Sequence, residues 1–183
     1  MRGFIYTELI ELIEHVHGEA FVDRWLDESD LPSGGAYTAV ATYPTSELVE
    51  LVSRLSALSG TPVPDLLRLY GEHLFDYLAD SHAALVEGFD DAFAFLEKLE
   101  QHVHAEVRKL YPDAEVPHFA IERPGHDRLV LTYRSSRAIP DLAHGLLLGA
   151  AKRFSQCIEI ERETLVEDGS CVRFRMRRDS SSQ

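Results

Sequence analysis

The chain has 183 residues, of which 45% are hydrophobic and 27% charged, and its formal net charge is −13. This size and composition are typical of one soluble domain that can bury a core or a cofactor without disulfides. The acidic charge argues against a nucleic-acid-binding protein, because neutralising phosphates requires a basic face.

Export and membrane insertion are not indicated either. Acidic residues from Glu8 onward interrupt the stretch where a signal peptide needs an apolar core. The longest apolar run, from Gly145 to Ala151, is far too short to span a membrane. We therefore expect a cytoplasmic protein in which Gly145 and Gly149 allow close approach of a neighbouring element or a ligand.

Hydrophobic periodicity predicts helices through the first two thirds of the chain. The expected helices run over 4–17, 20–26, 45–58, 65–78 and 89–110. Loop-forming residues separate them, most clearly over 32–44 and 59–64. Tyr111-Pro112 is expected to end the last and longest helix.

After Pro117 the apolar pattern changes to the two-residue period of strands. We predict two hairpins and a helix between them. The strands are expected over 118–122, 128–133, 158–166 and 172–176, and the helix over 140–154. The predicted fold class is α+β, with a helical N-terminal half packed on a C-terminal antiparallel sheet that carries an inserted helix.

The only two cysteines are Cys157, just before this second hairpin, and Cys171, between its turn and its second strand. A turn at 168–170 would place Cys171 opposite a residue near Val166, which leaves Cys157 out of register for a disulfide. We expect two free thiols, with a zinc site completed by a nearby histidine as the alternative.

A Tyr-x-Ser-x-Arg motif follows the second predicted strand, at Tyr133, Ser135 and Arg137. Alternate residues of an extended segment point to one face, so these side chains would present two hydroxyls and a guanidinium along one edge. Such a row is suited to carboxylates. Combined with a histidine on a helix, it would suit a flat, metal-containing ligand with acidic side arms, which describes heme.

Nine histidines suggest metal binding, but the close pairs are poorly placed for it. Residues two apart on a helix lie about 200° apart around its axis, so His102 and His104 cannot chelate one ion. Glu100 and His104 share a helix face, and a carboxylate–imidazole contact is the common outcome of that spacing. Heme iron needs only one axial histidine, and periodicity alone does not choose between His102 and His104.

Further motifs span nearly the whole chain. They are Met-Arg-Gly-Phe-Ile at residues 1–5, Pro-Val-Pro-Asp-Leu-Leu at 62–67, Gly-Glu-His-Leu-Phe at 71–75, His-Ala-Glu-Val-Arg-Lys-Leu-Tyr-Pro at 104–112, Pro-His-Phe at 117–119 and Gly-Leu-Leu-Leu-Gly at 145–149. Together with the Tyr-x-Ser-x-Arg motif, and in this order, they resemble the H-NOX family. These heme nitric oxide/oxygen-binding domains occur as bacterial proteins and as the sensor domain of soluble guanylate cyclase.

The resemblance implies that the chain binds heme b, iron protoporphyrin IX, between the helical half and the sheet. It implies that His104, 29 residues before Tyr133, is the proximal iron ligand. Tyr133, Ser135 and Arg137 would hold the heme propionates, and Pro117 would press on the porphyrin. It further implies one heme-binding domain over 1–178, with a helical subregion over about 1–62, a heme-ligating subregion over about 63–178, and a disordered tail at 179–183.

The distal pocket is where this chain indicates its own specificity. Family members that bind dioxygen stably use a distal tyrosine as hydrogen-bond donor, and the matching position, nine residues past Tyr133, is Leu142. The resemblance assigns the other pocket-lining positions to Ile5, Leu9, Leu74, Leu78 and Leu146. A wall without a donor favours nitric oxide over dioxygen, and carbon monoxide is a second gas to expect. The alternative is a rotated alignment that brings Tyr70 or Tyr77 inward.

We therefore expect a gas sensor and not an enzyme. The resemblance implies that nitric oxide weakens the bond between iron and His104, and that the output is made in trans by a histidine kinase or a cyclic-di-GMP enzyme. Two alternatives stay open. An oxygen-binding heme protein or heme enzyme would need a distal donor, for which His144 is the nearby candidate, and a cofactor-free interaction module would be colourless.

Overall fold

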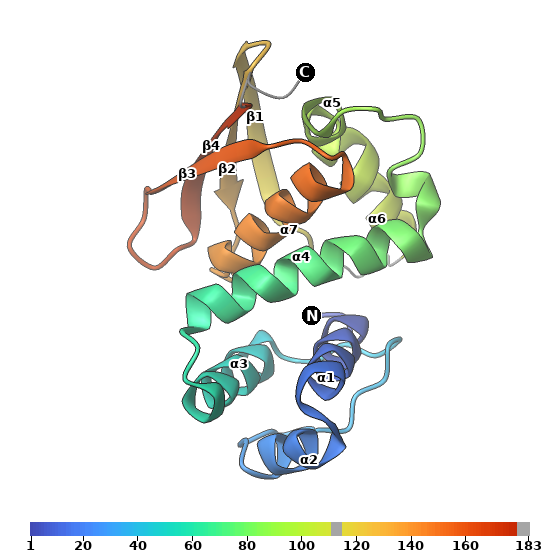
Figure 1. Ribbon diagram of the computed structural model, residues 1–183, viewed down its shortest axis with the longest axis vertical. Helices are drawn as coiled ribbons and strands as arrows, with labels where there is room; N and C mark the ends of the chain where they lie inside the picture. Colours follow the sequence, from blue (N-terminus) through green and yellow to red (C-terminus); the bar gives the residue numbers. More distant parts are fainter. Residues whose placement is uncertain (111–114, 179–183) are drawn as a thin grey trace.

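The computed structural model describes residues 1–110 and 115–178 and shows helices on one side of an antiparallel sheet (Figure 1). The helices are α1 (Phe4–His17), α2 (Glu19–Asp27), α3 (Thr45–Ser59), α4 (Val63–Ser81), α5 (Ala92–Glu97), α6 (His104–Leu110) and α7 (Pro140–Arg153). A short 3-10 helix spans Ala83–Leu85 and a π-helix spans Leu99–Val103. The strands are β1 (His118–Gly125), β2 (Arg128–Arg134), β3 (Ile158–Thr164) and β4 (Cys171–Arg178).

The four strands form one sheet in the order β1-β2-β4-β3, and every neighbouring pair is antiparallel. Leu131 of β2 pairs with Phe174 of β4, and both are fully buried. Leu129 and Tyr133 of β2 share this buried face, as the two-residue period predicts, and Thr132 on the opposite face is buried as well. The predicted α+β fold, with two hairpins and a helix between them, is confirmed.

Two hydrophobic cores divide the molecule. The first joins α1, α2 and α3 to one side of α4 and contains the fully buried Trp25 and Tyr6. The second lies between the sheet, α5 and α7 and contains Phe93 and Phe174. In Figure 1 the long helix α4 runs between α1–α3 and the layer formed by α7 and the sheet.

Glycines let α4 and α7 cross at close range. A Cβ on Gly71 would come within 2.7 Å of Gly145 Cα, and one on Gly149 would come within 2.6 Å of Phe75 Cβ. Neither space is available to a side chain, so the expected close approach at Gly145 and Gly149 is confirmed, with α4 as the neighbour.

The structure corrects two predicted helices. Helix α4 begins at Val63 and not at Asp65, because Pro64 fits the first turn, where no backbone N–H is needed. The single helix expected over 89–110 is divided by the π-helix before His104. A π-turn closes i→i+5 bonds and so shifts the helical faces, which hydrophobic periodicity does not reveal. The predicted end at Tyr111-Pro112 and the tail at 179–183 lie outside the described residues.

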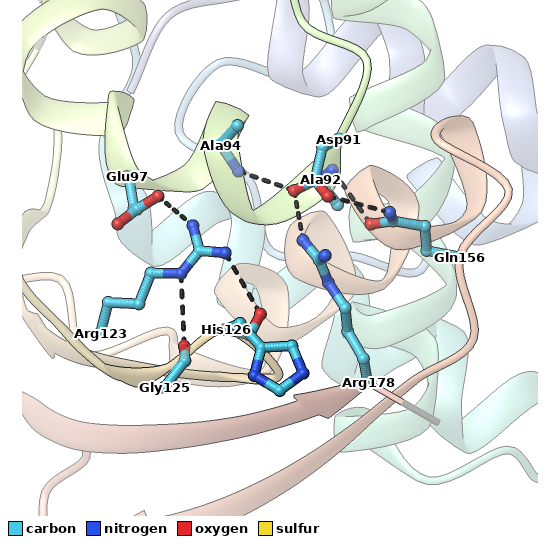
Figure 2. Close-up of polar contacts among 9 residues, drawn as sticks. All are labelled: Asp91, Ala92, Ala94, Glu97, Arg123, Gly125, His126, Gln156 and Arg178. Carbon is cyan, nitrogen blue, oxygen red and sulfur yellow. Dashed lines mark hydrogen bonds and ion pairs between the residues drawn. The ribbon is translucent and has the colours of Figure 1, made fainter. Parts of the chain in front are cut away.

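A polar cluster fastens α5 to the end of the sheet (Figure 2). Asp91 caps α5 by accepting the N–H of Ala94 at 2.9 Å, and it also accepts hydrogen bonds from Gln156 and Arg178. The Arg178 guanidinium lies 4.2 Å from the centroid of the Phe93 ring. One carboxylate thus joins α5, the segment after α7 and the last residue of β4.

Both cysteines are free thiols, as expected, with Cys157 exposed and Cys171 buried. The backbone N–H of Val166 donates to the Cys171 carbonyl at 3.1 Å, which is the predicted hairpin register. Within residues 1–110 and 115–178, no helix is both long and apolar enough to cross a membrane.

Candidate functional site

A cavity of about 230 Å³ lies where the two hydrophobic cores meet. Most of its lining is apolar and comes from the start of α1, from α4, from the α5–α6 segment and from α7. The lining residues among those described that carry polar side-chain groups are Arg2, Thr42, His104, Glu115, Tyr133, Ser135 and Arg137. An apolar space with a few polar groups is the usual form of a cofactor site.

Ten of the eleven site residues predicted from the sequence line this one cavity. They are Ile5, Leu74, Leu78, His104, Pro117, Tyr133, Ser135, Arg137, Leu142 and Leu146. The exception is Leu9, which is buried in the core of the N-terminal helices. The α1 residues on the cavity end at Ile5, so the wall is completed by Met1, Arg2 and Phe4 in place of Leu9.

His104 is the only histidine among the described lining residues, and only 7% of it is exposed. It is the first residue of α6, directly after the π-helix. Burial lowers the pKa of its imidazole, and the nearby Glu100 carboxylate only partly opposes this. His104 is therefore neutral at pH 7, the form in which an imidazole binds a metal.

The Glu100 carboxylate fixes the orientation of this ring. Its Oε1 lies 3.0 Å from His104 Nδ1 and also accepts the backbone N–H of Phe119 at 2.8 Å. Burial tends to raise the pKa of Glu100, but these hydrogen bonds outweigh it and the pKa is lowered. An ionised carboxylate must receive the proton of Nδ1, so the lone pair of the neutral ring lies on Nε2. The sequence predicted the contact with His104 but not the one with Phe119.

The other histidines considered lie elsewhere. His102 Nε2 is 3.3 Å from the Ala84 carbonyl oxygen, and its ring packs edge-on against Phe89. His144 packs its ring against Phe174, with the centroids 5.5 Å apart. Neither residue lines the cavity in the described part of the chain, and no cluster of three metal-ligating side chains is found there.

The Tyr-x-Ser-x-Arg motif reaches the cavity in a way that differs from the predicted extended row. Strand β2 ends at Arg134, and the chain then turns, with the Ala138 N–H donating to the Ser135 carbonyl at 3.2 Å. The turn is needed because α7 begins at Pro140 and runs back across the sheet. Strand alternation therefore does not place Ser135 and Arg137, although both line the cavity.

Each side chain of the motif has a donor to offer. The Tyr133 hydroxyl accepts the Ile139 N–H at 3.3 Å, which leaves its own proton for another acceptor. Arg137 donates to the carbonyl and carboxylate oxygens of Glu115, and its side chain is 21% exposed. The sequence did not indicate Glu115, which lies two residues before Pro117.

The wall assigned to the gas pocket is apolar. Leu142 is 7% exposed, and neither Tyr70 nor Tyr77 is among the described lining residues. The Tyr70 hydroxyl instead donates to the Ile5 carbonyl oxygen. The rotated alignment is therefore wrong for Tyr70, whose hydroxyl is directed at the backbone of α1.

Comparison with known proteins assigns the chain. The family described as haem-NO-binding matches residues 2–162. This chain belongs to the H-NOX family. H-NOX domains bind heme, so the predicted cofactor is confirmed, and the residues of the cavity suit it: a neutral axial imidazole, an apolar interior, and hydroxyl and guanidinium donors for carboxylates.

Solved H-NOX structures share the whole fold. The unliganded Fe(II) protein of K. algicida is 37% identical, with a TM-score of 0.94 over 100% of this chain and 99% of that one. The Fe(II)NO protein of S. oneidensis is 28% identical, with a TM-score of 0.90 over 98% and 100% of the two chains. The Fe(II)CO protein of Shewanella woodyi, bound to IWP-051, is 38% identical, with a TM-score of 0.84 over 100% and 97%. A search of curated proteins gave no match.

Proposed function

We propose that this H-NOX domain senses nitric oxide at a heme whose iron is bound by His104, and that it signals to a separate protein. The observation that carries the proposal is the composition of the cavity. Its described lining contains one histidine, the donors of the Tyr-x-Ser-x-Arg motif, and the leucines Leu74, Leu78, Leu142 and Leu146. Two related proteins have been solved with nitric oxide and with carbon monoxide on Fe(II).

The residues divide the work of binding. Heme iron supplies the open coordination position at which a diatomic gas binds. His104 presents the lone pair of Nε2, while Tyr133, Ser135 and Arg137 provide charge-assisted hydrogen bonds for the propionates. The apolar wall excludes water and offers no hydrogen bond to bound dioxygen, which gains more from one than nitric oxide does.

The signal path follows from which elements share the cavity. The start of α1 and the π-helix before α6 both line it, although they belong to the two different cores. We propose that His104 would hold the iron and Pro117 would contact the porphyrin face, so that a change in how His104 holds its ligand would shift the subregion 1–62 relative to 63–178. The partner class we propose is a histidine kinase or a cyclic-di-GMP enzyme.

Absorption spectroscopy of the purified, reduced protein tests this function. A Soret band is expected, with a shift on adding nitric oxide or carbon monoxide and no lasting change in air. A stable oxygen complex in air would overturn the proposed selectivity, and a colourless protein that does not take up added heme would overturn the sensor function.

The ligand assignment is tested by His104→Gly with imidazole supplied in the buffer. The variant is expected to bind heme through free imidazole and to lose the response of the partner to nitric oxide. His102→Gly is the matched control, because His102 lies on the same segment but contacts Ala84 and Phe89. Loss of the native ferrous spectrum in His102→Gly, and its retention in His104→Gly without imidazole, would reverse the assignment.

A further inference from the structure

Glu100 is a partly buried carboxylate that contacts two elements of the site. It lies in the π-helix, four residues before His104, and its side chain is 22% exposed. One oxygen, Oε1, accepts hydrogen bonds from His104 Nδ1 at 3.0 Å and from the Phe119 N–H at 2.8 Å. The other, Oε2, lies 3.5 Å from His118 Nδ1. The carboxylate thus joins the helix that carries the axial histidine to the strand that follows Pro117.

The Glu100 carboxylate is more rigidly held and less solvated than a carboxylate in an ordinary surface contact between helix residues four apart. Such a contact leaves the carboxylate mobile and well solvated. Here the backbone of β1 fixes the carboxylate, and the His104 side chain is only 9% exposed. The hydrogen bond therefore acts at low local dielectric, where a full negative charge polarises its donor strongly.

The chemical consequence concerns Nε2. An imidazole that donates Nδ1–H to a carboxylate gains negative charge on the ring and becomes a more basic ligand through its other nitrogen. The same hydrogen bond fixes the ring orientation, which lowers the entropy lost on binding iron.

We propose that Glu100 is a positioning residue that strengthens the bond between His104 and the heme iron and so sets how readily nitric oxide breaks it. The inference rests on the proposed function, because it takes His104 as the iron ligand. Glu100 never contacts the gas. It sets the response threshold through the histidine: a stronger iron–His104 bond keeps the resting state in place until nitric oxide is bound.

Glu100→Gln tests the charge while keeping the shape. The amide oxygen can still accept from His104 and Phe119, but it carries no charge. The iron–histidine stretching frequency of the ferrous protein, read by resonance Raman spectroscopy, is expected to fall, and the reduction potential of the heme is expected to rise. The rate at which nitric oxide breaks the iron–His104 bond should rise on the order of tenfold, the scale typical of partners that hydrogen-bond a metal ligand.

Glu106→Gln is the matched control. Glu106 lies on α6 and pairs with Lys109, and it is not among the described residues that line the cavity. The control should keep the stretching frequency, the potential and the rate of the unmodified protein. If Glu100→Gln keeps all three as well, the inference is wrong.

If Glu100→Gln does not retain heme, a second variant, Glu100→Asp, tests the same inference. Glu100→Asp keeps the charge but shortens the side chain by one methylene, so the carboxylate withdraws from Nδ1, and the same downward shift of the stretching frequency is expected. An unchanged frequency in Glu100→Asp would overturn the inference. The proposed function fails separately: its failure would appear in the unmodified protein as a ferrous spectrum without an iron–histidine band.

Discussion

At the scale of the residue, the proposed choice of gas depends on one position in the cavity wall. Leu142 lines the cavity with 7% of its surface exposed and stands where the resemblance places the hydrogen-bond donor of oxygen-binding relatives. Leucine offers only van der Waals contact, so bound dioxygen would lack the partner that stabilises it. Selectivity would then depend on one hydroxyl that the chain does not supply at this position.

Leu142→Tyr should therefore lengthen the lifetime of an oxygen complex, because the phenol can donate to bound dioxygen. Flash photolysis in air measures that lifetime. Leu142→Phe is the control, because it adds the same ring without the hydroxyl, and both variants carry an overpacking cost of about 1–3 kcal/mol. Equal lifetimes in the two variants would show that this position does not set the choice of gas.

Two neighbouring arginines differ in whether they line the cavity. Arg137 lines the cavity and donates to Glu115, whereas Arg134 ends β2 and is exposed. Arg137→Ala should weaken heme retention by about 10-fold to 100-fold, since a hydrogen bond to a charged group contributes about 1.5–3 kcal/mol. Transfer of heme to an excess of apomyoglobin gives the dissociation rate. Arg134→Ala should match the unmodified protein, and equal loss in both variants would remove Arg137 from the site.

At the scale of the element, the crossing of α4 and α7 limits what the helices can carry. A Cβ on Gly145 would overlap the Arg68 carbonyl oxygen and come within 2.8 Å of Gly71 Cα. Both obstacles are backbone, which cannot turn aside as a flexible side chain can. The two helices must therefore separate to admit even one methyl group.

Gly145→Ala is expected to destabilise the protein by about 1–3 kcal/mol, the usual cost of overpacking, despite the better helix propensity of alanine. Gly125→Ala makes the same change where the nearest atom is the Asp127 side-chain oxygen at 3.1 Å, and it should cost much less. Urea unfolding of both variants measures the difference. Equal midpoints would mean that the helix crossing tolerates a methyl group.

The cap of α5 gives a pH-dependent prediction. Burial tends to raise the pKa of Asp91, but hydrogen bonds from Ala94 and Gln156 and the charge of Arg178 outweigh it and lower the pKa from 3.8. A carboxyl whose pKa is lower in the folded state contributes stability above its unfolded pKa and loses it as the pH falls through its folded pKa. The contribution should be complete at pH 7 and disappear below about pH 3.8.

Asp91→Asn keeps a capping oxygen and removes the charge, so it isolates this contribution. The variant should be less stable by about 1 kcal/mol at pH 7, with the difference closing in acid. Denaturant unfolding at a series of pH values from 7 to below 3.8 measures it. Asp90→Asn, at the exposed neighbouring residue, should show no such difference. A gap in the Asp91 variant that does not begin to narrow as the pH falls below about 3.8 would assign the effect to the shape of the side chain.

The sequence predicted element types better than their geometry. Period-two and helical patterns located every strand and most helices, because each buried face repeats along a continuous segment. The π-helix before His104 and the turn after Arg134 were not predicted, because neither leaves a periodic pattern in the sequence. For Leu9 the pattern shows burial but not which core receives it, and the residue lies in the helical core and not among the described residues that line the cavity. Glu115 carries no periodic signal at all.

At the scale of the whole molecule, the cavity lies between two cores that also meet along the crossing of α4 and α7. Phe4 and Leu74 reach it from the helical core, and Phe119 and Leu147 reach it from the sheet core. A heme in this cavity would complete both cores at once. The bound cofactor should then contribute to the stability of the entire chain and not only to that of its immediate neighbours.

Removal of heme should accordingly lower the melting temperature of the protein. Mass action gives about 2.7 kcal/mol of stabilisation when free heme is at 100 times its dissociation constant. Hydrogen exchange locates the effect: amides at the start of α1 and in α6 should lose protection in the heme-free protein. The hairpin of β3 and β4 is the internal control, because none of its described residues lines the cavity. Equal loss of protection in this hairpin would mean that heme stabilises the protein only against global unfolding. Unchanged protection of the α1 amides would mean that the helical core does not depend on the cofactor. Ligand binding could then not reach the 1–62 subregion by this route.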